Sequence, residues 1–218
     1  MIGPAQVELA ITTFVTFFVV IDAVAVAPIF ASLTVGKGSA YARAMAVKSP
    51  VVAALILYLF ALFGPWLLKH MGISLNAFRV GGGVLLFLIA IEMVFEKRQE
   101  RQKTRADAVL ADSEISGQLD DISVFPIGIP MIAGPGSIAT AMLSMQSAGS
   151  DPVGVGIVVA AIGLNLLLTA LIFLISGPLM KIMGENIAGA IARIFGVILS
   201  ALAVQLIVDG LKGAFGLK

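Results

Sequence analysis

The chain has 218 residues, of which 59% are hydrophobic and 12% are charged, with a net charge of +1 at pH 7 and no cysteine. Its mean hydropathy is +1.06, whereas soluble domains are about half apolar and about a quarter charged. This composition indicates an integral membrane protein. With His70 as the one histidine, it excludes disulfides, thiolate catalysis and imidazole clusters, and it gives no basic surface for a nucleic acid.

Six apolar runs are each long enough to cross the hydrocarbon core, which is about 30 Å thick and takes about 20 helical residues. We place them near residues 6–34, 45–68, 74–95, 123–147, 153–180 and 188–210. The predicted fold class is therefore an all-α integral membrane protein with six transmembrane helices. Residues 1–95 hold the first three spans, residues 123–218 hold the other three, and a charged linker at 96–122 joins them.

The linker at 96–122 carries basic residues in its first part and acidic residues in its second. We interpret it as a solvated linker, with a phospholipid or regulatory contact as the alternative. Its basic residues lie on the same side of the predicted spans as Lys37, Arg43 and Lys181, so the positive-inside rule places that side in the cytoplasm and both termini outside. No basic residue precedes Lys37, so we expect the first span to be retained and not cleaved as a signal peptide.

Each half of the chain holds an odd number of predicted spans, so two homologous halves would insert in opposite orientations, as in the inverted repeats of secondary transporters. Arg-x-x-Gly occurs near the start of the third span, from Arg79, and of the sixth, from Arg193. We interpret these arginines as gates or as partners of a buried carboxylate. Arginines that only reach the membrane interface are the alternative.

In the first span, Asp22 lies deep in the membrane, where a carboxylate is expected to be functional. It would bind a substrate ammonium, hold Na⁺ or carry a proton, and a protonated or arginine-paired structural carboxyl is the alternative. Pro28 is expected to reopen the helix and to leave the N–H groups of Ile29 and Phe30 free.

The fourth span is interrupted by PMIAGPGSIATAM at residues 130–142. Its prolines remove backbone donors and its glycines add freedom, so we expect a turn or more to unwind. Unwound backbone persists in a membrane only where protein or a water-filled cavity surrounds it. The helix that restarts at Pro135 would present the N–H groups of Gly136, Ser137 and Ile138 to a carboxylate. A plain proline kink is the alternative.

Polar side chains follow this interruption at helical spacing. Ser137, Thr140 and Ser144 form a hydroxyl stripe that would face a substrate path, with packing between helices as the alternative. Asn165 and Thr169 lie one turn apart in the fifth span, where they would line a cavity or bond a neighbouring helix. The triple glycine at 81–83 is expected to let another helix approach closely.

Three stretches resemble the signatures of the MarC family, also called the small neutral amino acid transporter family. They are FFVVIDAVAVAPIFASLT in the first span, GGGVLLFLIAIEMVF in the third and PMIAGPGSIATAM in the fourth. The resemblance covers nearly the whole chain and carries over Asp22, Pro28, Pro130 and the block at 133–137. Where the family has Asp-Pro-x-Gly-Asn-x-Pro, this chain has Asp-Ala-Val-Ala-Val-Ala-Pro, which predicts less unwinding in the first span and a less polar site.

The resemblance implies a six-helix inner-membrane transporter with both termini outside, related in fold to amino acid exporters of the LysE type and associated with glycine, alanine and similar amino acids. We expect a secondary transporter that holds this substrate at mid-membrane between the first and fourth spans, with membrane lipids around it. The chain has no GxxxxGK[ST] loop for ATP, so H⁺ or Na⁺ is the expected coupling ion, without a cofactor.

The expected substrate-binding residues are Asp22, Pro28, Ile29, Phe30, Ala133, Gly134, Pro135, Gly136, Ser137, Ile138, Thr140 and Asn165, and those expected to gate or couple transport are Asp22, Arg79 and Arg193. The alternatives are an exporter of amino acids or other small molecules on the same fold, and a non-transporting scaffold or sensor. A membrane-embedded enzyme is disfavoured because Ser137 has no base at its depth. The sequence leaves open the direction of transport and whether the chain forms a homo-oligomer.

Overall fold

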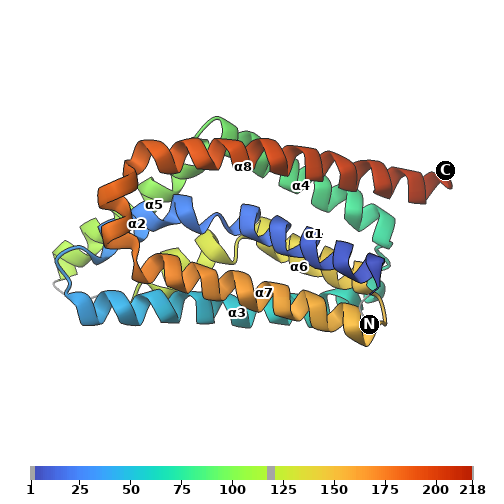
Figure 1. Ribbon diagram of the computed structural model, residues 1–218, viewed down its shortest axis with the longest axis horizontal. Coiled ribbons are helices and arrows are strands. Elements are labelled where there is room, and N and C mark those ends of the chain that lie inside the picture. Colours follow the sequence, from blue (N-terminus) through green and yellow to red (C-terminus); the bar gives the residue numbers. More distant parts are fainter. Residues whose placement is uncertain (1–2, 117–120, 218) are drawn as a thin grey trace.

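The computed structural model describes residues 3–116 and 121–217 as a bundle of helices, and residues 117–120 of the predicted linker lie outside this range (Figure 1). The elements are α1 (Pro4–Ile21), α2 (Ala23–Thr34), α3 (Ser39–His70), α4 (Leu75–Val94), α5 (Lys97–Ser116), the irregular segment η1 (Ser123–Ile132), α6 (Pro135–Ala148), α7 (Pro152–Leu174) and α8 (Ser176–Phe215). The described residues contain no strand, which confirms the predicted all-α class.

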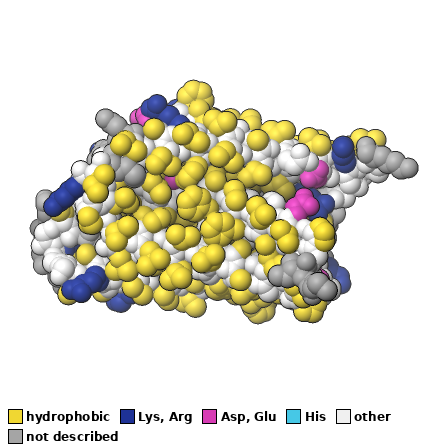
Figure 2. Space-filling model, in the orientation of Figure 1, with side chains coloured by type: hydrophobic (Ala, Val, Ile, Leu, Met, Phe, Trp, Pro, Cys, Tyr) yellow, Lys and Arg dark blue, Asp and Glu magenta, His cyan; other side chains and the backbone are white. Residues whose placement is uncertain are grey.

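Five helical stretches are long and apolar enough to cross a membrane, and the bent pair of η1 and α6 makes six if it counts as one span. Figure 2 shows hydrophobic side chains over the flank of the bundle, with most of the visible charged side chains near its two ends. Such an apolar belt is suited to lipid and not to water. The chain is therefore a multi-pass membrane protein, and both ends of the chain lie at the same end of the bundle (Figure 1).

The first span changes direction at Asp22, which separates α1 from α2 in a left-handed conformation with φ 51° and ψ 51°. Aspartate is among the few residues other than glycine that adopt this conformation readily. The Asp22 carbonyl then accepts the first bonds of α2, from the amides of Ala25 (3.0 Å) and Val26 (3.1 Å). Asp22 itself therefore ends one helix and begins the next.

The prediction that Pro28 reopens this span was wrong. Pro28 lies inside α2, and Ile29 and Phe30 continue the same helix. A proline inside a helix removes one hydrogen bond, but α2 continues past Pro28. The chain changes direction instead at the left-handed residue Asp22. Phe30 is a packing residue, with its ring stacked on Phe173 at a centroid distance of 4.5 Å.

The fourth span is irregular up to Ile132 and becomes a regular helix only at Pro135. Phe125 and Ile129 have extended backbone angles, because each precedes a proline, which disfavours the helical conformation. Gly134 is the extended N-cap of α6 and Pro135 is its first residue, where the missing proline N–H costs nothing. The axes of η1 and α6 differ by 58°.

Most of the predicted linker is helical. Its side chains between Lys97 and Leu110 are mostly exposed, as expected of a solvated segment, and one face packs against the bundle. Helix α5 (Lys97–Ser116) contacts α2, α4 and η1, and it lies beside α2 at the end of the bundle away from the termini (Figure 1). Ala106 is 1% exposed and Gln102 is 7% exposed. The segment is polar in composition, but Ala106, which is small, and Gln102, which is uncharged, lie one turn apart and face the bundle.

Helices α4 and α8 form the most extensive helix pair, and glycines allow their close approach. A Cβ on Gly83 would lie 2.8 Å from the Ala203 carbonyl oxygen and 2.7 Å from Ile207 Cγ1. Gly196 and Gly210 meet backbone carbonyls of α4 at 2.9 and 2.8 Å in the same way. A Cβ on Gly82 would likewise lie 2.8 Å from Leu143 Cδ1 of α6, so two of the three glycines at 81–83 have the close-packing role predicted for them.

We expect Gly83→Ala to lower the free energy of unfolding by about 1–3 kcal/mol, because overpacking against rigid backbone forces the helices apart. Gly81→Ala is the matched control, since its Cβ would meet nothing within 4 Å. Thermal unfolding in detergent, followed by circular dichroism, checks the difference. Equal melting temperatures for the two variants would contradict the close contact between α4 and α8.

Candidate functional site

The two interrupted spans meet inside the bundle. A Cβ on Gly136, in the first turn of α6, would lie 3.2 Å from Val20 Cγ1, two residues before the turn at Asp22, and 2.6 Å from Ile89 Cδ1 of α4. Asp22 and Ala133 are each only 3% exposed. The end of α1 and the start of α6 therefore share one buried junction, where backbone groups released by the interruptions need partners within the protein.

The start of α6 keeps two amides open. Ile138 N–H donates to the Gly134 carbonyl at 3.0 Å, so it is not free as predicted, because the N-cap carbonyl takes the first intrahelical bond. The N–H groups of Gly136 and Ser137 precede that bond and have no acceptor among the described residues. Two adjacent amides at the positive end of a helix form a cradle for one carboxylate oxygen or a comparable anion.

The end of α1 is capped by an arginine from α5. Arg98 Nη2 donates to the Val20 carbonyl at 2.8 Å, and Arg98 Nη1 lies 3.3 Å from Met93 Sδ. The guanidinium and the Asp22 carboxylate attract each other, while Asp22 Oδ1 is buried without a hydrogen-bond partner. The junction therefore contains a buried carboxylate that faces a positive charge and still has an open acceptor.

The two arginines predicted as partners of Asp22 lie elsewhere, so that pairing was wrong. Arg193 forms an ion pair with Glu96 at the end of α4, and Arg79 lines a cavity at the opposite end of α4. Sequence reasoning missed Arg98 in the role. It is one of several basic residues after the third span, and no spacing rule indicates which of them turns back into the bundle.

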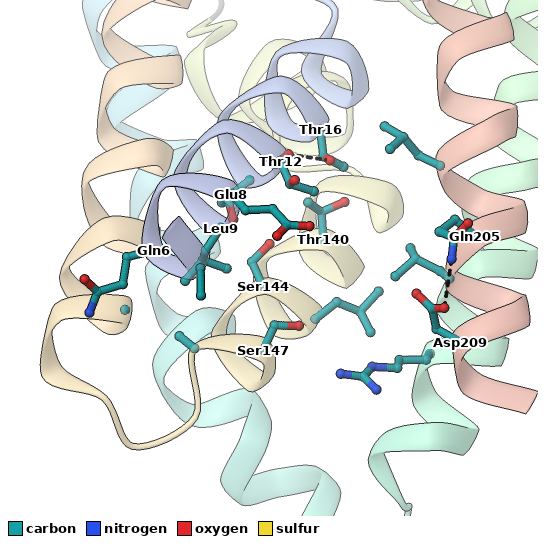
Figure 3. A pocket seen from close by; sticks show the side chains of 18 of the residues that line it. Gln6, Glu8, Leu9, Thr12, Thr16, Thr140, Ser144, Ser147, Gln205 and Asp209 are labelled. Carbon is teal, nitrogen blue, oxygen red and sulfur yellow. Dashed lines mark hydrogen bonds between the residues drawn. The ribbon is translucent and has the colours of Figure 1, made fainter. Parts of the chain in front are cut away.

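A cavity of about 730 Å³ reaches from the end of the bundle near the termini toward this junction (Figure 3). In Figure 3, Glu8, Thr12 and Thr16 of α1 face Thr140, Ser144 and Ser147 of α6. Asp209 and Gln205 of α8 lie across from them and bond each other at 2.8 Å. This cavity is called the outer cavity below because it opens at the end of the bundle near the termini, and its wall combines hydroxyls and carboxylates with apolar side chains such as Leu143 and Leu206.

At the rim of the outer cavity, Asp151 connects α1 to the start of α7. Its carboxylate accepts from Gln6 Nε2 of α1 at 3.0 Å and from the amides of Val153 and Gly154 at 3.1 Å, where it caps α7. The Gln6 amide, followed by the capped N–H groups, holds the pKa of Asp151 below its usual range. The carboxylate therefore stays ionised at neutral pH and joins α1 to α7.

The inner end of the outer cavity is formed by Thr16 and Thr140. Thr16 Oγ1 donates to the Thr12 carbonyl at 2.7 Å, but Thr140 Oγ1 is buried without a partner. Ser144 lines the same cavity, whereas Ser137 donates to the Ile132 carbonyl at 2.7 Å. The predicted hydroxyl stripe thus divides into two cavity residues and one that supports the interruption. An open hydroxyl one helical turn from the free amides is a candidate ligand group.

A second cavity, of about 300 Å³, lies on the other side of Asp22. It is formed by α2, α5 and the start of the α8 span, and it includes Ala25, Pro28 and Ile29. Asp22 lines neither cavity. A buried apolar cluster that includes Val19, Val20, Leu86, Ala90 and Met93 closes the junction. The smaller cavity is called the inner cavity below, and the buried cluster lies between it and the outer cavity.

Asn165 has two partners in the bundle. Its Nδ2 donates to the Phe14 carbonyl of α1 at 3.2 Å and to the Ala161 carbonyl at 2.9 Å, and Thr169 Oγ1 donates to the Asn165 carbonyl at 2.8 Å. Of the two roles considered for Asn165, cavity lining and a bond to a neighbouring helix, the structure has the second. The described residues contain no group of three or more His, Asp or Glu side chains that would hold a metal ion.

Comparisons with known proteins agree with this architecture. Residues 7–215 match the family model described as MarC family integral membrane protein. The chain is 37% identical to the UPF0056 membrane protein MJ1677 of Methanocaldococcus jannaschii, over 94% of this chain and 96% of that protein. It is 36% identical to the UPF0056 membrane protein YvbG of Bacillus subtilis, over 93% of each. No solved structure matches the chain.

Proposed function

Because the chain belongs to the MarC family of integral membrane proteins, we propose that it is a secondary transporter of small neutral amino acids such as glycine and alanine. It works in the inner membrane with both termini outside, and it couples transport to H⁺ or Na⁺. The observation that carries the proposal is the buried junction, where Gly136, which carries one of the two free amides, packs against Val20, two residues before the open carboxylate of Asp22.

The junction suits a zwitterion. The amides of Gly136 and Ser137, at the positive end of α6, receive the substrate carboxylate, and Asp22 receives the ammonium. The surrounding side chains of Val20, Leu86 and Ile89 already approach Gly136 closely. An apolar junction with so little space favours the smallest side chains, which is the reason for proposing glycine and alanine.

The two cavities provide the two sides of an alternating path. The substrate reaches the junction from the outer cavity past Thr16 and Thr140, and leaves through the cavity between α2 and α5, or moves in the opposite direction. In this proposal α1–α4 and η1–α8 are inverted repeats, each beginning with an interrupted span. Rocking of one repeat against the other then opens one cavity at a time.

Flux measurements on purified protein in liposomes test the proposal. We expect counterflow of labelled glycine or alanine and accumulation driven by a pH or Na⁺ gradient, with empty liposomes and labelled lysine as controls. Absence of both binding and flux of glycine and alanine under every gradient would refute the substrate class. Flux of other small molecules alone would instead support the exporter alternative, and no substrate-dependent stabilisation by any of them would support the scaffold.

A further inference from the structure

We propose that α5 is the cytoplasmic gate of the transport path and that Arg98 closes it by occupying the helix interruption at Asp22. The role of this gate in transport rests on the proposed function. The closed position of α5 does not, because it can be tested in the protein without substrate. It requires that Arg98 be displaced before a substrate ammonium can bind at the junction.

The first step is the backbone group that Arg98 satisfies. In a continuous helix the Val20 carbonyl would accept from the amide four residues later, but the left-handed turn at Asp22 ends α1 before that bond forms. Arg98 Nη2 supplies the missing donor at 2.8 Å, from 78 residues further along the chain. A charge-assisted bond of this kind is stronger than a neutral one, so it holds α5 against the interruption.

The second step is charge. Asp22 is the carboxylate in the buried junction, and Arg98 is the cation that acts on it. Glu92 and Arg101 also act on Arg98, and they form an ion pair with each other. Arg98 and Asp22 are therefore left to compensate each other. A substrate ammonium offers the same positive charge and N–H donors as the guanidinium, so the two cations compete for Asp22 and the Val20 carbonyl.

The third step is position. The inner cavity of about 300 Å³ has α2 on one side, through Ala25 and Ile29, and α5 on the other, through Gln99 and Ala106. Figure 1 shows α5 lying along α2 at the end of the bundle away from the termini. Most side chains of α5 between Lys97 and Leu110 are exposed or only partly buried, and elements with few buried contacts open at low cost. Movement of α5 would join this cavity to Asp22.

The absence of cysteine from the chain permits an accessibility test. Ala25→Cys places a reporter in the wall of the cavity between α2 and α5, where Ala25 is 5% exposed, and Ser32→Cys places an exposed control in the same cavity. Inside-out vesicles are treated with a membrane-impermeant maleimide, and no substrate is needed. We expect Arg98→Gln to speed labelling of the Ala25→Cys reporter about tenfold, which corresponds to about 1.4 kcal/mol.

Matched arginine variants make the test specific. Arg105→Gln removes the same charge from an exposed position of α5 and should leave the labelling rate unchanged, and Arg98→Lys should restore most of the protection. Equal rates in Arg98→Gln and the parent would overturn the gate. So would faster labelling of a cysteine at Ala141, which is 0% exposed in the core, because it would indicate general unfolding.

This test is separate from the test of the proposed function. Faster labelling of the Ala25→Cys reporter in Arg98→Gln, together with no flux of glycine or alanine, would support the gate and refute the substrate class. Flux of glycine with no change in labelling would support the transporter and overturn the gate.

Discussion

Asp22→Asn should lower kcat/KM for glycine by about 10- to 100-fold, the effect of losing a hydrogen bond to a charged group of about 1.5–3 kcal/mol. Asparagine has the shape of aspartate and also adopts the left-handed conformation readily, so the turn between α1 and α2 is retained. The variant lacks the charge that attracts a substrate ammonium or holds Na⁺, and it has no proton to exchange. We therefore also expect accumulation to become independent of the pH or Na⁺ gradient.

Liposome flux with and without an imposed gradient measures both effects. Asp209→Asn is the matched control, because Asp209 is a carboxylate in the exposed part of the outer cavity, bonded to Gln205, and its loss should leave the gradient dependence intact. Melting temperature and elution volume in detergent identify any variant that fails to fold. Uptake by Asp22→Asn that matches the parent in rate and in gradient dependence would remove Asp22 from the mechanism.

The membrane spans could be predicted from the sequence because hydrophobic length is a property of one segment at a time. The stretches proposed as spans correspond closely to the helices of the structure. The irregular backbone before Pro135 was also predictable, since proline and glycine restrict or free the backbone wherever they occur. Each of these inferences needed only neighbouring residues.

The chemistry of the junction depends on distant residues and was not predictable in the same way. The Val20 carbonyl bonds Arg98 across 78 positions, and the packing of α5 against α2 that makes this bond depends on the whole bundle. In the first span, the sequence predicted a break at Pro28, but the chain turns at Asp22. A left-handed aspartate has no signature in the sequence that would have located the turn. The open amides of Gly136 and Ser137 followed from local rules. The amide of Ile138 was wrongly expected to be open, because the sequence did not identify Gly134 as the N-cap whose carbonyl accepts from it.

Thr140→Val should raise the KM for glycine about tenfold and leave the melting temperature equal or higher. Valine has the shape of threonine, and Thr140 Oγ1 is buried without a partner. Replacing an unsatisfied buried hydroxyl with a methyl group removes a desolvation cost instead of a bond. A hydroxyl kept open at the inner end of the outer cavity is explained if the passing substrate bonds it, and the loss of a hydrogen bond of about 1.4 kcal/mol gives the tenfold change.

Thr169→Val is the matched control, since Thr169 is equally buried but its hydroxyl donates to the Asn165 carbonyl. That variant should melt at a lower temperature and keep the parent KM. The two threonines thus have opposite expected signatures, one in transport and one in stability. If Thr140→Val kept the parent KM while gaining stability, Thr140 would be an unsatisfied packing residue, and the substrate path would have to reach Gly136 along another wall of the cavity.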